Sequence, residues 1–165
     1  MPESPDPELV RRLEESAERL FRFCLHLTGG HRADAEDLAQ ETLVSGFRAL
    51  PGFLRRAQLT TYLYTIATHA WRRRVKRQDS DILPLHEADS PTCDPTLAHL
   101  HRLRLYEAMD TLPFPLREAF VLVKVQQLTH REAAEVLGVP TGTVQSRVHE
   151  AIRHLRKALS EDVLK

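Results

Sequence analysis

Side chains that can read the edges of DNA bases gather near the C-terminal end of the chain. Gln145 and Arg147 carry the amide and guanidinium groups that form paired hydrogen bonds with adenine and guanine, respectively. Arg153, further along, could meet backbone phosphates. The sequence therefore predicts a surface that contacts duplex DNA, with these candidate residues: Thr143, Gln145, Ser146, Arg147, His149 and Arg153.

A second cluster combines aromatic and basic residues. Tyr62 and Trp71 precede five positive charges that fall within six residues: Arg72, Arg73, Arg74, Lys76 and Arg77. Single-stranded nucleic acid stacks its bases on aromatic rings, and its phosphates meet basic side chains. Two alternatives stay open. A basic run at a helix C-terminus is favourable to the helix dipole, and Tyr62 and Trp71 could be core residues.

The segment that carries the first surface has the features of a helix-turn-helix motif. Thr129 and Glu132 have the spacing of a capping box, and Gly138 can take the left-handed turn that ends a helix. The next helix has apolar residues at steps of three and four: Val144, Val148, Ile152, Leu155 and Leu159. Such a motif presents the N-terminal polar face of its second helix to the major groove. The alternative is an ordinary helical hairpin with solvated charges.

Apolar residues at helical spacing recur along most of the chain, and no alternating run predicts a sheet. Asp34 is the expected N-cap of the second helix. The fold class is therefore all-α, with helices predicted over residues 9–27, 34–50, 59–77, 96–111, 115–126, 129–138 and 141–159.

Charge divides the 165 residues into three parts. Residues 1–78 hold 13 basic and 10 acidic residues, and residues 99–165 hold 10 basic and 8 acidic residues. Residues 79–98 hold five acidic residues, no Lys or Arg, and three prolines. We therefore predict two small helical domains, each with a small core, joined by an acidic, proline-containing linker.

Several protein classes do not fit the sequence. It has no His-Glu-x-x-His pair, P-loop, glycine-rich dinucleotide turn or nucleophile elbow, so we expect no enzyme and no cofactor. A zinc site is an alternative, because the chain holds four possible ligands close together: His86, Cys93, His99 and His101. Their irregular spacing favours coincidence, and we expect no metal.

The chain has no apolar run of the ~18–20 residues that a membrane span needs. Its acidic, proline-rich start is unlike a signal peptide, so we expect a cytoplasmic protein with no membrane insertion. Only two cysteines occur, which excludes a disulfide scaffold. Cys24 falls on an apolar stripe and is expected to be a small buried residue.

Five motifs follow one another along the chain. They read LFRF with LTG (20–29), DAEDLAQET (34–42), TYLYTIA (61–67), LP with REAF (112–120) and VPTGTVQSR (139–147). In this order they resemble the extracytoplasmic-function (ECF) sigma factors, the minimal promoter-specificity subunits of bacterial RNA polymerase. The resemblance covers nearly the whole chain, from about Leu9 to Leu159.

The resemblance implies a role for each part. The helix with Asp37, Gln40, Glu41 and Arg48 would bind the polymerase clamp, and the helix-turn-helix would read the −35 element as duplex. The linker would run through the polymerase channels. Melting and capture of the −10 element as single strand would fall to these residues: Arg55, Arg56, Tyr62, His69, Trp71, Arg72, Arg73, Arg74, Lys76 and Arg77.

Two residues depart from the family pattern. Tyr62 stands where the family usually has tryptophan, and His69 stands where asparagine is common, which leaves the −10 sequence open. The resemblance also implies control by an anti-sigma factor. The alternatives are a helix-turn-helix repressor or activator, which would not need the 34–42 motif, and a sigma mimic that forms no holoenzyme.

Overall fold

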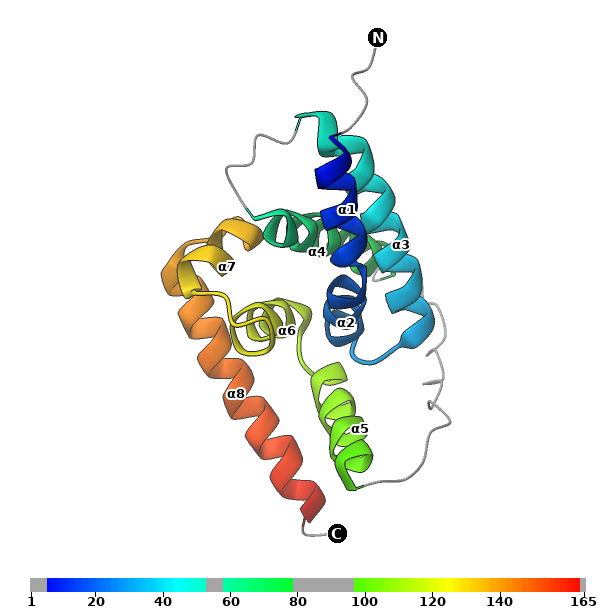
Figure 1. Ribbon diagram of the computed structural model, residues 1–165. Coiled ribbons are helices and arrows are strands. Elements are labelled where there is room, and N and C mark those ends of the chain that lie inside the picture. Colours follow the sequence, from blue (N-terminus) through cyan, green and yellow to red (C-terminus); the bar gives the residue numbers. More distant parts are fainter. Residues whose placement is uncertain (1–5, 53–57, 79–96, 164–165) are drawn as a thin grey trace.

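The computed structural model describes residues 6–52, 58–78 and 97–163, and every regular element in these ranges is a helix (Figure 1). The all-α prediction is confirmed. Most of the predicted linker, 79–98, lies outside the described residues. The elements are α1 (Pro7–Glu15), α2 (Ala17–Leu27), α3 (Arg32–Ala49), the 3-10 turn η1 (Leu50–Gly52), α4 (Leu59–Gln78), α5 (Leu97–Asp110), α6 (Phe114–Phe120), the π-helical η2 (Val121–Val125), α7 (His130–Leu137) and α8 (Thr141–Val163).

The single helix predicted over residues 9–27 is wrong, because the chain turns at Ser16 between α1 and α2. The Ser16 hydroxyl donates to the Arg12 carbonyl oxygen at 2.7 Å, and the Ser16 N–H is shared between the carbonyls of Arg12 and Leu13. A serine that bonds back to the preceding turn bends a helix. The apolar periodicity continues across the bend, so the sequence pattern does not show it.

The N-terminus of α3 also differs from expectation. Its N-cap is His31, without a side-chain capping bond, and Asp34 lies in the first turn. There the carboxylate still favours the helix dipole, although it caps nothing. The predicted 115–126 helix ends its α-helical part at Phe120 and continues as the π-helical η2.

The helix-turn-helix forms as its sequence predicts. Thr129 accepts from the Glu132 backbone N–H at 3.2 Å, and the Glu132 carboxylate accepts from the Thr129 backbone N–H at 2.8 Å. Gly138 adopts a left-handed conformation at the end of α7, with φ of 65°. The apolar stripe of α8 packs inward, with Val144, Val148 and Leu155 buried.

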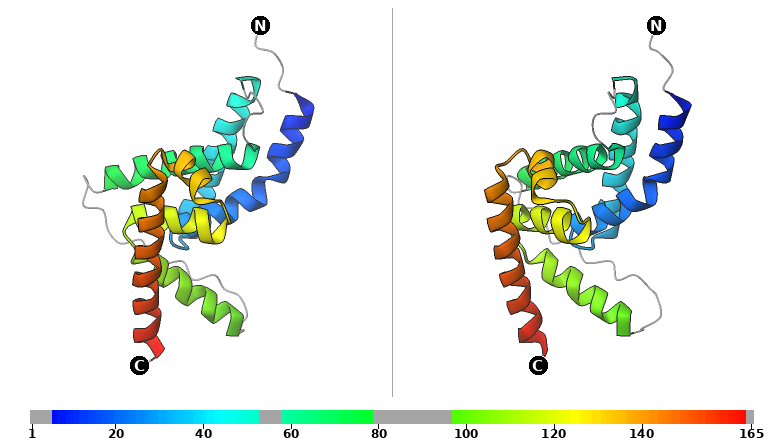
Figure 2. Two further views of the ribbon diagram at one scale, coloured as in Figure 1. Left: turned by 90° about the vertical axis from the view of Figure 1, so that its left-hand side faces the viewer. Right: turned by 60° about the vertical axis from the view of Figure 1, so that its left-hand side comes forward.

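α4 lies between the two halves of the molecule. It packs against α2 and α3 on one side and against α7 on the other (Figures 1 and 2). The buried residues therefore form one continuous cluster, from Phe23 and Leu63 in the first half to Met109 and Leu122 in the second. The sequence predicts two small cores, and the contact between the halves merges them. None of the described helices is long and apolar enough to cross a membrane.

Candidate nucleic-acid and polymerase interfaces

The polar side of α8 holds the residues expected to read duplex DNA. Gln145, Ser146, His149 and Arg153 are exposed, whereas Thr143 is partly buried. The Ser146 hydroxyl donates to the Thr143 carbonyl oxygen at 3.0 Å. The amide of Gln145 and the ring of His149 stand one helical turn apart and share a face. Five of the six candidates thus lie near one another on or beside an open surface; the sixth is Arg147.

Arg147 forms an ion pair with a buried carboxylate on α6. Its Nη1 lies 3.4 Å from Oε1 of Glu118 on α6, and 25% of its side chain is exposed. The Glu118 side chain is only 2% exposed. A buried carboxylate needs a positive partner, so this ion pair fixes α8 against α6 within the second half of the chain. Arg147 can offer bases only the part of its guanidinium that Glu118 leaves free.

The basic cluster of α4 divides between solvent and partners. His69, Arg73, Lys76 and Arg77 are exposed. The spacing of these four residues, at steps of four, three and one, places them along one side of α4. Arg74 is partly buried and binds Glu41 at 2.7 Å. These four side chains form an exposed positive side that phosphates could reach, and Arg73 also lies 3.7 Å from Glu41.

Three other −10 candidates on α4 are partly or wholly buried. Trp71 is 6% exposed, so it is a core residue in this structure. This is the alternative that the sequence analysis left open for it. Tyr62 packs partly buried against the same core. Arg72 forms a double ion pair with Glu118 across the two halves. Arg55 and Arg56 lie outside the described residues.

The outer face of α3 carries the candidates for polymerase binding. Asp37, Gln40 and Arg48 are exposed. Glu41 instead turns toward α4, where it binds Arg74 at 2.7 Å and Arg73 at 3.7 Å. The sequence prediction groups these four residues, and the structure keeps three on the open face. Glu41 joins α3 to α4.

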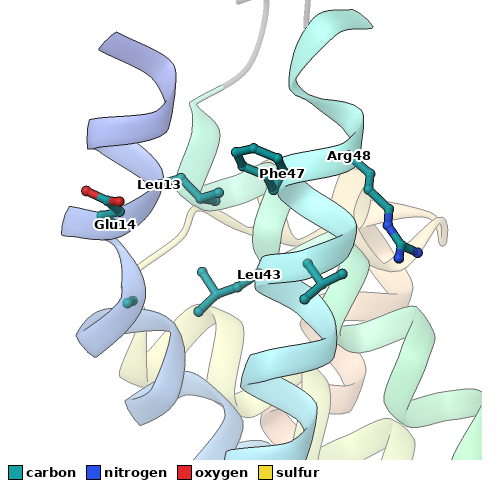
Figure 3. Close-up of a pocket in the computed structure, with 7 residues that line it drawn as sticks. Leu13, Glu14, Leu43, Phe47 and Arg48 are labelled. Carbon is teal, nitrogen blue, oxygen red and sulfur yellow. The ribbon is translucent and has the colours of Figure 1, made fainter. Parts of the chain in front are cut away.

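The same face exposes two apolar residues that the sequence analysis missed. Val44 is 50% exposed and Phe47 is 46% exposed. They line a groove of about 430 Å³ between α1 and α3, together with Leu13, Leu43 and the aliphatic parts of neighbouring residues (Figure 3). Phe47 has the spacing of a core residue, but its side chain lines the open groove between α1 and α3 and is not covered by α1 (Figure 3). Only the packing of α1 reveals this surface.

Burial shifts the pKa of two side chains on α2. Burial raises the pKa of the Cys24 thiol to about 12. Burial also lowers the pKa of the His26 ring, although its bond to the Arg22 carbonyl acts in the opposite direction. Among the described residues no group of three His, Cys, Asp or Glu side chains could hold a metal ion. His86 and Cys93 lie outside the described residues, as does the His99 side chain.

Family models match both halves of the chain. Residues 13–80 match sigma-70 region 2, and residues 102–155 match sigma-70 region 4. The ECF RNA polymerase sigma factor EcfG of Rhodopseudomonas palustris is 31% identical over 147 residues, which cover 87% of this chain and 80% of EcfG. This chain belongs to the ECF sigma factor family. A second ECF sigma factor, SigE of Mycolicibacterium smegmatis, is 34% identical over 162 residues, covering 93% of this chain and 61% of SigE.

Two solved structures share the fold. The sigma factor RpoE in complex with the anti-sigma factor NepR, from Bartonella quintana, has a TM-score of 0.75 at 24% identity and covers 94% of this chain and 98% of that chain. CnrH in complex with the cytosolic domain of CnrY has a TM-score of 0.72 at 22% identity and covers 95% of this chain and 91% of that chain. At these identities the likeness concerns the fold.

Proposed function

We propose that this ECF sigma factor directs core RNA polymerase to promoters by reading a −35 element as duplex and capturing a −10 element as single strand. The observation that carries the proposal is that one chain combines two exposed faces. One is the polar face of α8, which follows the turn at Gly138, and the other is the basic side of α4. The protein acts by binding, without catalysis, in the bacterial cytoplasm where the polymerase works.

Reading of the −35 element is assigned to the first turns of α8. The exposed Gln145 supplies an amide for adenine, and Arg147 supplies a guanidinium for guanine. Thr143, Ser146 and His149 complete the surface, and Arg153 continues it toward the phosphates.

Capture of the −10 strand is assigned to α4 and the segment before it. The exposed side of α4 offers His69, Arg73, Lys76 and Arg77. Its other candidates are Tyr62, Trp71, Arg72 and Arg74, with Arg55 and Arg56 before the helix. Basic side chains meet the phosphates of a single strand, and aromatic rings stack with its bases.

Polymerase binding is assigned to the outer face of α3. Asp37, Gln40 and Arg48 form a polar border around the apolar residues Val44 and Phe47. An apolar centre within a polar rim is the usual anatomy of a protein interface. Glu41 supports this face through Arg74. The second half would bind the flap region of the polymerase.

Control by an anti-sigma factor is also proposed. RpoE, which shares this fold, was solved in complex with the anti-sigma factor NepR, and CnrH, which also shares it, was solved with a bound partner, the cytosolic domain of CnrY. The proposed domain limits are 1–78 and 99–165, with residues 79–98 as the linker.

Reconstituted transcription tests the proposal. The full chain is mixed with sigma-free core polymerase and a genomic fragment library from its own source, and the 5′ ends of transcripts are sequenced. We expect discrete start sites that share two upstream elements. Binding to duplex DNA without binding to core polymerase would establish the repressor or activator alternative. Binding to core without any start site would establish a sigma mimic.

A further inference from the structure

We propose that in the free chain the helix-turn-helix half docks against the inner side of α4, with Arg72 as the latch. This docking withholds Arg72 from DNA, although the exposed side of α4 with Arg73 stays open. This inference rests on the proposed function of α4. It concerns an arrangement of the free protein, so it can be tested without polymerase or promoter.

Arg72 makes the central contact. Its Nε and Nη2 donate to the two carboxylate oxygens of Glu118 at 2.8 Å and 2.7 Å, and its Nη1 donates to the Leu137 carbonyl oxygen at 3.0 Å. One guanidinium from α4 thus binds both α6 and the end of α7. A bidentate arginine–carboxylate pair is among the strongest side-chain contacts and fixes orientation as well as distance.

Two further contacts join the two halves. The Tyr64 hydroxyl, two turns before Arg72 on α4, donates to the Gln126 side-chain oxygen at 2.7 Å. His31, just before α3, lies 3.2 Å from the carboxylate of Asp110 at the end of α5. The three contacts spread over the interface and hold the halves in one orientation.

The turn between α2 and α3 fits closely against α5. A Cβ placed on Gly30 would lie 2.8 Å from Cβ of Tyr106, and the Tyr106 ring stands 5.2 Å from the His26 ring. Arg117 adds a bond of 3.4 Å to the Leu27 carbonyl oxygen. Only a glycine permits this approach, so the docking uses features of both halves.

The latch and the proposed DNA contact exclude each other. Arg72 uses Nε, Nη1 and Nη2 on Glu118 and Leu137, and only 26% of its side chain is exposed, so it must leave these partners before it can reach the −10 strand. Release is feasible because Glu118 keeps a second positive partner, Arg147 at 3.4 Å, when Arg72 leaves. Polar contacts of this kind are also typical of interfaces between domains that move relative to one another.

Small-angle X-ray scattering of the full chain tests the latch. Arg72→Ala removes the central contact, and Tyr106→Ala loosens the interface from the other half without touching α4. Arg73→Ala is the matched control, because it removes the same charge from the next residue, whose side chain is 65% exposed. We expect a larger radius of gyration for Arg72→Ala and Tyr106→Ala, and a wild-type value near 15 Å for Arg73→Ala, as a compact chain of this length has.

The scattering result alone decides whether Arg72 holds the two halves together. Wild-type dimensions in both Arg72→Ala and Tyr106→Ala, or an equal expansion in Arg73→Ala, would overturn it. Circular dichroism of each variant should show unchanged helix content, since an expansion through unfolding would also contradict the proposal.

The affinity for a short fluorescent single-stranded DNA of random sequence then measures how far the docking of the two halves weakens DNA binding. Tyr106→Ala keeps every α4 residue, so opening should tighten its binding by about fivefold or more, because the competent state becomes more populated. If Tyr106→Ala expands the chain and its affinity does not rise, the latch stands and the assignment of α4 to the −10 strand fails.

Discussion

Cys24 and His26 lie two residues apart on α2, and burial shifts the pKa of each side chain. Ionisation of either group costs free energy there, because desolvation disfavours the charged form of each. The thiol pKa rises to about 12, and the ring pKa falls below its ordinary value. Both side chains therefore report on the integrity of the first half.

The Cys24 thiol should react only when the protein unfolds. In a Cys93→Ser background, the remaining thiol is 0% exposed and almost wholly protonated at neutral pH, whereas the thiolate is the reactive form. We expect a chromogenic disulfide reagent to leave the native protein unmodified and to react rapidly in concentrated urea. Rapid reaction under native conditions would contradict the burial.

Protonation of His26 should destabilise the fold. The unfolded chain protonates this ring near its ordinary pKa of 6.5, and the folded chain does so only at lower pH. The unfolded state therefore binds more protons as the pH falls below that value. The stabilising contribution is fully present above it and is lost as the pH drops toward the folded-state pKa.

Urea unfolding at about pH 7.5 and about pH 5.5 measures this effect. The free energy of unfolding should fall less between these two pH values in His26→Gln than in the wild type. His149→Gln, which replaces an exposed ring, should follow the wild type. Identical losses in His26→Gln and the wild type would show that other groups carry the pH dependence.

At the scale of elements, caps and glycines set the limits of the helix-turn-helix. Gly138 and Gly142 lie on either side of the start of α8 and make a matched pair. A Cβ added to either would meet nothing within 4 Å, so packing does not distinguish them. Only their backbone conformations do, because Gly138 has a φ of 65° and Gly142 is helical.

Alanine at these two positions should therefore have opposite effects. Gly138→Ala forces a left-handed conformation on a residue with a Cβ and should cost about 1–2 kcal/mol of unfolding free energy. Gly142→Ala should raise it by roughly 0.5–1 kcal/mol, because alanine loses less backbone entropy in a helix. Urea denaturation of both variants gives the comparison, and losses of similar size would refute the argument.

At the scale of the whole molecule, unpaired surfaces point to partners. Three large apolar residues are exposed in the part of the chain that the structure describes: Val44, Phe47 and Leu100. Two of them lie on the α3 face beside the groove, and Leu100 lies on α5 in the other half. This pattern favours α3 as the interface with the polymerase core.

Phe47→Ser should weaken binding to core polymerase by about tenfold or more, as the loss of an aromatic interface residue commonly does. Leu100→Ser is the control, because the two side chains are equally exposed at 46%. Fluorescence anisotropy of the labelled protein with core polymerase measures both affinities. An equal loss in the two variants would remove the α3 face from the interface.

Local patterns determined the helices and the motifs. The capping box at Thr129, the left-handed Gly138 and the apolar stripe of α8 depend on near neighbours, so they can be read from spacing. The bend at Ser16 was not predictable, because the apolar period crosses it unchanged. The order of motifs indicated the family, which the comparisons confirm.

Tertiary packing decided which candidate residues are accessible. Trp71 and Phe47 are both aromatic residues at helical spacing, yet Trp71 is 6% exposed and Phe47 is 46% exposed. Arg72 and Arg73 are adjacent and identical, yet Arg72 binds Glu118 across the molecule, whereas Arg73 is 65% exposed and lies 3.7 Å from Glu41 within its own half. The sequence specifies what each side chain can bind. The partner it receives depends on residues far away in the chain, which only the packing of the two halves brings near.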